Sequence, residues 1–235
     1  MPPKTPSPSC SPARRSEARL ARLVAAGALT KQLRAAGIRV SHAAARGVAP
    51  DTSTLAFTEH SATLARVLAA MNKPSDNFMA EELLKGLGAG FGTGGTTVAG
   101  ADVAQRFLES VGVGDGFRIR DGSGLSYQDK LTVRAVLKIL GAMARRPDFA
   151  VFRHSLSIAG VDGTLKDRMR GTAAAGNVRA KTGTLNAASS LSGYVTTVDG
   201  HTLSFSMLMN GDPVPLAQAH AAQDAVAVLL ARATL

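Results

Sequence analysis

The sequence contains one cysteine, no tryptophan and few other aromatic residues, and each scarcity excludes a class of protein. Cys10 has no partner within the chain, so an intrachain disulfide cannot form. Aromatic residues make up 4% of the chain, too few for the aromatic platforms on which a protein stacks the bases of single-stranded nucleic acid. The five histidines are far apart and no second cysteine is present, so the sequence predicts no metal site and no cofactor.

Long apolar runs are also missing. No stretch of about 18 apolar residues occurs, so the sequence predicts no membrane-spanning helix. Residues 1–18 are rich in proline and serine and do not form the apolar core of a secretory signal. We therefore expect a disordered leader over 1–18 and a folded region over 19–235, whose 45% hydrophobic content allows a substantial core.

Acidic residues are in the minority. The chain has 17 aspartates and glutamates against 27 lysines and arginines, which gives a formal charge of +10. Such a charge could attract a nucleic acid or another acidic polymer. The arginines, however, are scattered and interleaved with acidic residues, as on solvated helix faces, so we expect no nucleic-acid partner.

Hydrophobic periodicity and turn residues divide the chain into helices followed by strands. Helices are expected over 17–37, 61–72, 75–89, 101–113, 131–147 and 213–233. Residues 90–100 read as a flexible connection, and 117–126 as a short strand that leads into a tight turn. Antiparallel strands are expected over 178–185 and 192–210, with a hairpin turn at Asp199-Gly200. The order predicts an α+β fold with an antiparallel sheet flanked by helices.

Two short motifs carry the chemical signal. Ser75-Asp76-Asn77 opens a predicted helix, and Lys181-Thr182-Gly183 opens a predicted strand 106 residues later. Alone, the first motif most often marks a helix N-cap, here Ser75, and the second an ordinary strand start. In this order they resemble the second and third signatures of the serine penicillin-recognising enzymes.

Four blocks extend this resemblance over most of the chain from about residue 30 onward. They are MNKPSDNFMAEELLK, DGSGLS, AGVDGTLKDRM and RAKTGTLNAASSLSGYVTT, in that order. They are similar to the blocks of the class C low-molecular-mass penicillin-binding proteins, which are D-alanyl-D-alanine carboxypeptidases and endopeptidases. The resemblance implies a β-lactamase/transpeptidase-like fold, here its C-terminal part, and peptidoglycan stem peptides ending in D-Ala-D-Ala and β-lactam antibiotics as partners.

The resemblance also implies roles for the motif residues. Cationic Lys181 and the hydroxyls of Thr182 and Thr184 would hydrogen-bond the free carboxylate of the peptide. Gly183 would leave room for a substrate backbone along the strand edge. The backbone N–H at Thr184 would belong to an oxyanion hole.

The serine motif would complete the site. Ser75 would relay a proton to the departing D-alanine, and Asn77 would hold the substrate amide and the neighbouring lysine. The implied catalytic residues are thus Ser75, Asn77 and Lys181, and Asp76 is either a helix-terminus acid or a site residue.

The family's nucleophile motif, a serine three residues before a lysine, is missing. The residues three positions before the eight lysines are Met1, Ala28, Ala70, Glu82, Tyr127, Ala135, Gly163 and Val178, and none is a serine. We therefore expect the C-terminal part of a longer enzyme, with an incomplete sheet, and no turnover by this chain alone.

Three other readings stay open. A class A-like β-lactamase shares both short motifs, but no segment between them clearly supplies the deacylating glutamate. A non-catalytic peptidoglycan-binding protein would keep the carboxylate grip without turnover. A nucleic-acid binder is the remaining use of the positive charge. The family resemblance implies a periplasmic or other extracytoplasmic location. The sequence shows no export signal, so two alternatives stay open: the signal lies in an upstream part, or this product stays in the cytoplasm.

Overall fold

The computed structural model describes residues 12–235 apart from 46, 49, 56–57, 59 and 115, and only the backbone of residues 12–22. The chain divides into two compact units, Met1–His60 and Ser61–Leu235. In the part of the chain that the structure describes, no helix is both long and apolar enough to cross a bilayer.

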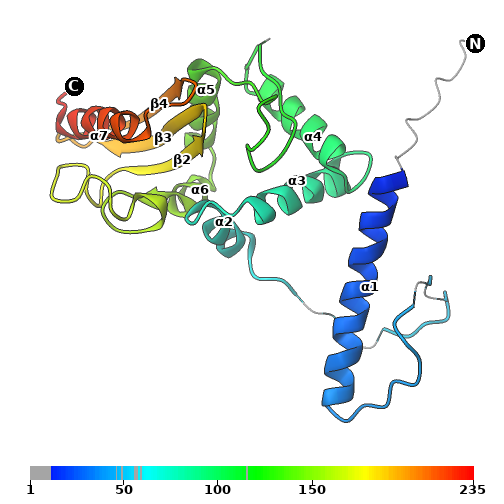
Figure 1. Ribbon diagram of the computed structural model, residues 1–235. Coiled ribbons are helices and arrows are strands. Elements are labelled where there is room, and N and C mark those ends of the chain that lie inside the picture. Colours follow the sequence, from blue (N-terminus) through cyan, green and yellow to red (C-terminus); the bar gives the residue numbers. More distant parts are fainter. Residues whose placement is uncertain (1–11, 46, 49, 56–57, 59, 115) are drawn as a thin grey trace, which may run out of the picture. The chain divides into compact units, whose positions relative to one another are not determined.

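The first unit contains helix α1, Pro12–Ala35 (Figure 1). The helix includes residues 12–18, which the sequence placed in the disordered leader; residues 1–11 of that leader lie outside the described residues. Helix is favourable there because the segment after Pro12 is rich in alanine, arginine and glutamate, and proline itself is well tolerated at the first helical position. In the last turn of the helix, the Arg34 guanidinium donates to the carbonyl of Val40 at 2.8 Å.

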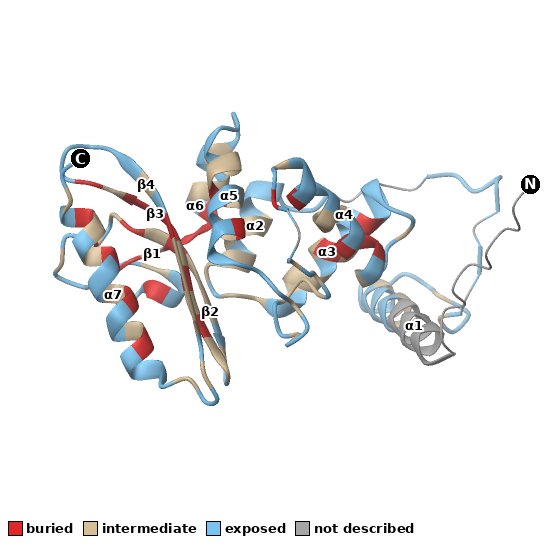
Figure 2. Cartoon of the chain, turned by 90° about the horizontal axis from the view of Figure 1, so that it is seen from above, coloured by how far each residue is buried: buried red, intermediate tan, exposed pale blue. Residues whose placement is uncertain are grey.

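A four-stranded antiparallel sheet organises the second unit. Its strands are β1 (Ser157–Ile158), β2 (Arg179–Leu185), β3 (Ala188–Thr196) and β4 (Thr202–Asn210), paired in chain order. Helix α7 (Leu216–Arg232) covers one face, and α2 (Leu64–Asn72), α5 (Val133–Ala144) and α6 (Phe149–Ser155) lie on the other (Figures 1 and 2). The predicted α+β arrangement and the hairpin around Asp199-Gly200 are confirmed.

Alternation along β3 gives each face of the sheet its own core. Leu191 and Val195 are fully buried with Ala227 of α7. Tyr194 points to the opposite face, where it packs with Leu140 and donates its hydroxyl to the Leu140 carbonyl at 2.7 Å. Burial raises the pKa of the Tyr194 phenol to about 12, which reflects its place inside this core. Both cores fix β3, and through it the neighbouring strand β2.

Helices α3 (Asn77–Phe91) and α4 (Thr97–Ser110) pack against each other beside this sheet assembly (Figure 1). The connection expected over 90–100 is shorter than predicted, because α4 begins at Thr97. Its N-cap is Thr96, whose hydroxyl accepts the backbone N–H of Ala99 at 3.1 Å. The capping threonine thus turns the second half of the Gly/Thr segment into helix.

The strand predicted within residues 117–126 is wrong. Only an isolated bridge between Arg118 and Lys130 forms there. Carboxylates take the backbone donors instead: Asp129 accepts from the Arg120 N–H at 2.5 Å, and Asp121 from those of Gly124 and Ser126. The segment is therefore a loop fastened by aspartates. The short 3₁₀ turn η1 (Gly163–Leu165), β1 and α6 were not predicted.

Candidate functional site

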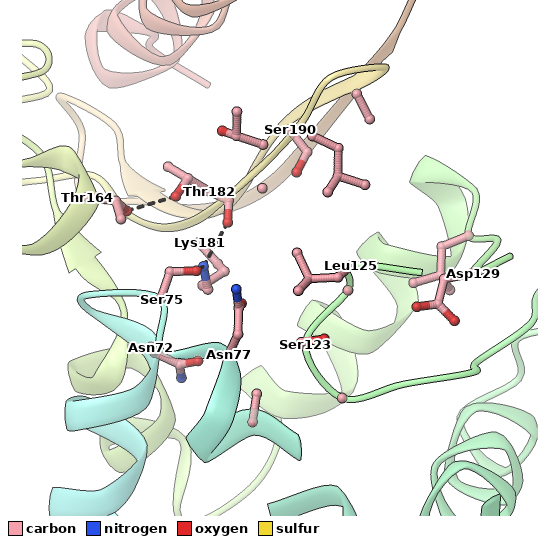
Figure 3. A pocket seen from close by; sticks show the side chains of 18 of the residues that line it. Asn72, Ser75, Asn77, Ser123, Leu125, Asp129, Thr164, Lys181, Thr182 and Ser190 are labelled. Carbon is pink, nitrogen blue, oxygen red and sulfur yellow. Dashed lines mark hydrogen bonds between the residues drawn. The ribbon is translucent and has the colours of Figure 1, made fainter. Parts of the chain in front are cut away.

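A pocket of about 910 Å³ lies where the start of α3, strand β2 and the loop 122–125 meet. All six residues that the sequence selected as site residues contribute to its lining. Figure 3 shows Ser75, Asn77, Lys181 and Thr182 around one open space. The structure therefore brings the two short motifs together across a single pocket; their catalytic and binding roles remain predictions.

Ser75 occupies a strained turn just before α3. Its φ of 62° lies in the left-handed region, which costs a residue other than glycine of order 1–3 kcal/mol. The predicted N-cap role of Ser75 is wrong. Asp76 is the cap, with its carboxylate accepting the Met79 N–H at 2.8 Å, because α3 begins at Asn77 and Ser75 precedes the capping position by one residue. The hydroxyl of Ser75 is thus available to the pocket.

Lys181 holds that hydroxyl. Its ammonium donates to Ser75 Oγ at 2.7 Å and to the Thr182 carbonyl at 2.7 Å. Because an ammonium has no acceptor, Ser75 accepts in this pair and keeps its own proton to donate. Lys181 has a third donor that neither contact uses. Burial lowers the pKa of the Lys181 ammonium, which marks it as a cation partly withdrawn from water.

Strand β2 presents the rest of its motif at an open edge. Strand β1 pairs only with Arg179 and Ala180, so the edge of β2 from Lys181 to Leu185 has no strand partner among the described residues. Thr184 is exposed there and lines the pocket. An extended peptide could add to this edge by backbone hydrogen bonds.

The structure gives a reason for glycine at position 183 that the sequence did not indicate. A Cβ at this position would come within 2.5 Å of Ser190 Oγ on the neighbouring strand. The absent side chain thus makes room for the Ser190 hydroxyl, which also lines the pocket. Room for a substrate backbone remains a prediction.

Asn77 begins α3 and is exposed. Its side chain points into the pocket beside the hydrogen-bonded Ser75 and Lys181 (Figure 3). Among the described residues it makes no hydrogen bond, so the predicted contact with the lysine is absent and its amide is open to a ligand. Within the same described part, no group of three or more His, Cys, Asp or Glu side chains could hold a metal ion.

The loop with the sequence DGSGLS forms the opposite wall of the pocket. Glu81 of α3 accepts hydrogen bonds from the backbone N–H groups of Gly122 and Ser123, both at 3.0 Å, and from the Ser123 hydroxyl at 2.9 Å. These three bonds fasten the loop to the helix that carries Asn77. Ser123 and Leu125 line the pocket as a result (Figure 3).

Asp129 lies at the far end of this wall. Burial, reinforced by the nearby charge of Asp121, raises the pKa of Asp129 to about 6, although the Arg120 N–H favours the charged form. The pocket therefore contains a carboxyl group that takes up a proton in weakly acidic solution.

Sequence reasoning did not assign roles to Ser123, Asp129, Thr164 or Ser190, although all four line the pocket. Three of them stand in the blocks that carried the family resemblance, so block membership was the available signal. Asp129 stands outside those blocks. Its approach to Asp121 depends on the fold of the loop and left no pattern in the sequence.

Comparisons with known proteins agree on one family. Residues 9–233 match the D-Ala-D-Ala carboxypeptidase 3 (S13) family. The D-alanyl-D-alanine carboxypeptidase of Actinomadura sp. (strain R39) is 42% identical over 179 residues, which cover 73% of this chain and 32% of that protein. The chain thus spans about a third of the length of this relative.

Solved structures extend the likeness to the fold. Penicillin binding protein 4 (dacB) from Haemophilus influenzae, complexed with a β-lactam, matches with a TM-score of 0.76 and 26% identity, over 89% of this chain and 51% of that chain. The TLA-1 extended-spectrum β-lactamase matches with a TM-score of 0.53 and 15% identity, over 72% of this chain and 62% of that chain. The second match shows the fold alone. Together they confirm the predicted β-lactamase/transpeptidase-like fold.

Proposed function

Because the chain belongs to the D-Ala-D-Ala carboxypeptidase 3 (S13) family, we propose that its pocket binds peptidoglycan stem peptides ending in D-Ala-D-Ala. The chain would be part of a serine-type carboxypeptidase or endopeptidase. The observation that carries the proposal is the 2.7 Å hydrogen bond from Lys181 to Ser75 beside the open edge of β2. A cation, a hydroxyl and an unpaired strand edge meet there. Together they provide partners for the carboxylate and for the backbone at the C-terminus of a peptide.

The terminal carboxylate of the peptide would accept from Lys181. Two donors of this ammonium already bind Ser75 and the Thr182 carbonyl, and the third would reach the ligand. The exposed hydroxyl of Thr184 would add a hydrogen bond, and the partly buried setting of Lys181 would strengthen the charged one.

The peptide backbone would lie along β2 from Lys181 to Leu185. An added strand gains hydrogen bonds that do not depend on side chains, so this part of the grip would accept different stem peptides. Asn77, whose amide is open to a ligand, would bind the amide of the peptide. A backbone N–H at Thr184 would face the carbonyl that reacts.

Turnover would need a nucleophile that this sequence does not contain in the family's Ser-x-x-Lys form. Ser75 keeps a proton to donate, which suits proton transfer to a leaving amine. We therefore expect the chain to bind the peptide without hydrolysing it, and to bind β-lactams through their carboxylate without forming an acyl bond. Intact-mass spectrometry after incubation with benzylpenicillin would show an unchanged mass; an added mass of the antibiotic would overturn this part.

Calorimetric titration with an acetylated stem peptide ending in D-Ala-D-Ala tests the grip itself. We expect saturable binding of the free acid. The C-terminal amide, which has no carboxylate, should bind at least about 10-fold more weakly than the acid. Lys181→Met should weaken the free acid by about 10- to 100-fold, the loss of one hydrogen bond between charged groups.

Lys85→Met is the matched control. Lys85 lies on α3, outside the pocket, in an exposed pair with Glu82. Its replacement should leave the affinity unchanged. Equal affinity for acid and amide, or no saturable binding by the folded chain, would contradict the proposal.

Peptidoglycan lies outside the cytoplasmic membrane, so we also propose an extracytoplasmic site of action.

A further inference from the structure

Lys73 forms an ion pair on the outer side of the Ser75 turn. Its ammonium donates to Asp162 Oδ2 at 2.5 Å and to the Leu156 carbonyl at 3.2 Å. The side chains of Lys73 and Asp162 are 25% and 34% exposed, and neither residue lines the pocket. The pair is therefore too sheltered for an ordinary surface contact and too remote to touch a ligand.

Asp162 joins this pair to the turn after β1. Its second carboxylate oxygen accepts the Ile158 N–H at 2.8 Å. One carboxylate thus binds the end of β1 and the lysine at the end of α2 together. The turn between β1 and η1 cannot shift without moving the partner of Lys73.

The backbone of Lys73 makes a second connection to the same segment. Its carbonyl accepts the Thr164 N–H at 3.0 Å and the Ser157 hydroxyl at 3.2 Å. Gly163 makes this approach possible. It has a φ of 58°, and a Cβ there would meet Ser157 Oγ and come within 2.7 Å of the Lys73 carbonyl oxygen.

Thr164 connects this segment to the Lys181-Thr182-Gly183 motif. Its hydroxyl oxygen accepts the Thr182 hydroxyl at 2.8 Å, as drawn in Figure 3. Thr182 follows Lys181, whose ammonium binds Ser75 two residues after Lys73. These hydrogen bonds and the short backbone segments between them form a closed ring through Lys73, the 162–164 segment, Thr182, Lys181 and Ser75. The ring spans both motifs, and the Lys73–Asp162 pair is the part of it that lies outside the pocket.

We infer that Lys73 and Asp162 are positioning residues that hold Ser75 in its left-handed turn against Lys181. The strained conformation of Ser75 needs support from its surroundings, and the only residue between it and Lys73 is Pro74. The consequence for peptide affinity rests on the proposed function; the consequence for the geometry of Ser75 and Lys181 does not.

The test compares Asp162→Asn and Lys73→Met with the double variant and with Lys166→Met. The Asp162→Asn side chain keeps an oxygen for the Ile158 N–H but turns an amide donor or a neutral oxygen to the lysine, so the fold should survive. Lys166 is an exposed lysine in the same part of the chain and serves as the control. Readouts are the side-chain NMR titration of Lys181, the affinity for the stem peptide and the urea unfolding midpoint.

We expect each single variant to move the pKa of Lys181 back toward its ordinary value. When the Ser75 turn loosens, water reaches the ammonium and the burial that lowers its pKa is reduced. The peptide dissociation constant should rise by about 3- to 10-fold, and the double variant should match the singles, because both residues act through one contact. Lys73→Arg, which restores a cation, should recover most of the affinity. Lys166→Met should resemble the wild type.

A purely structural pair would lower the unfolding midpoint and leave the Lys181 titration of the folded protein unchanged, and that result would overturn the inference. Additive losses in the double variant would also overturn it. Should Lys73→Met fail to fold, Asp162→Asn and Lys73→Arg decide between these outcomes. If the wild type binds no peptide, the proposed function fails, while the Lys181 titration still decides whether Lys73 and Asp162 position the site.

Discussion

Two neighbouring residues at the start of α3 have different roles: Asp76 caps the helix and Ser75 binds Lys181. The sequence suggested a helix cap for Ser75 and, by family resemblance, a proton relay. The structure gives the capping role to Asp76 and leaves the Ser75 hydroxyl bonded to Lys181. The reason is positional: α3 begins at Asn77, so Asp76 occupies the capping position and Ser75 stands one residue before it. The cap next to Ser75 therefore frees it for the pocket.

Residue identity was predictable where a motif recorded it and hidden where only the fold created the contact. Lys181 and Ser75 were found because two short motifs and their spacing are preserved in the sequence. The pairing of Lys73 with Asp162 joins residues 89 apart. No periodicity or composition connects such positions, since the contact depends on how α2 and the turn after β1 come together.

The carboxyl group of Asp129 leads to a prediction about pH. Its raised pKa means that the folded state holds a proton between about pH 4 and pH 6 that the unfolded chain has released. The contribution of Asp129 to stability is therefore greatest below this window and is lost as the pH rises through about 6. At neutral pH the buried charge near Asp121 opposes folding.

Asp129→Asn should therefore stabilise the protein at about pH 7, by roughly 1 kcal/mol or less because the group is partly solvated. The amide can accept from the Arg120 N–H and donate to Asp121, as the protonated carboxyl does. At about pH 4 the variant and the wild type should have nearly equal free energies of unfolding. Urea unfolding at both pH values measures this, and a difference that does not depend on pH would contradict it.

Helices and strands were predictable from local patterns when they were long. Helix α5, for example, has the apolar spacing of an amphipathic helix and a threonine cap, Thr132, and the strands of the β3–β4 hairpin flank an Asp-Gly turn. Strand β1 has two residues, and its existence depends on pairing with β2. Helix α6 has seven residues and packs Phe152 against Tyr194. Such short elements are stabilised by tertiary contacts that a local pattern does not contain.

Substitutions at two helix caps distinguish an effect on stability from an effect on peptide binding. Asp76 caps α3 and lines the pocket, whereas Thr132 caps α5 and does not line it, with its hydroxyl accepting the Ala135 N–H at 3.1 Å. Asp76→Ala and Thr132→Ala should each lower the free energy of unfolding by about 1 kcal/mol. Only Asp76→Ala should also weaken the stem peptide, because the first turn of α3 carries Asn77.

Thermal or urea unfolding gives the first quantity, and calorimetry of the peptide gives the second. Asp76→Asn, which keeps a capping oxygen, should restore most of both. Equal loss of affinity in the Thr132 variant would mean that general destabilisation, and not the position of α3, governs binding.

Over the molecule as a whole, the pocket belongs to one of the two compact units. Every residue that lines it lies within Ser61–Leu235, as do the three hydrophobic clusters of the described residues. Family resemblance predicted the fold of this unit, because its blocks run from the serine motif to strand β3. It did not predict the division at residue 60, where no change in composition marks a boundary.

Removal of residues 1–60 should therefore leave peptide binding intact. The remaining unit keeps both faces of its sheet covered, by α7 on one side and by α5 and α6 on the other, so its cores do not depend on α1. We expect residues 61–235 to fold, as seen by circular dichroism, and to bind the stem peptide within about twofold of the full chain, since every residue that lines the pocket lies within this unit. Lys181→Met in the shortened chain is the control and should abolish the same share of affinity as in the full chain. A folded 61–235 unit that had lost the peptide would place part of the grip in residues 1–60 and contradict the assignment of the site to one unit.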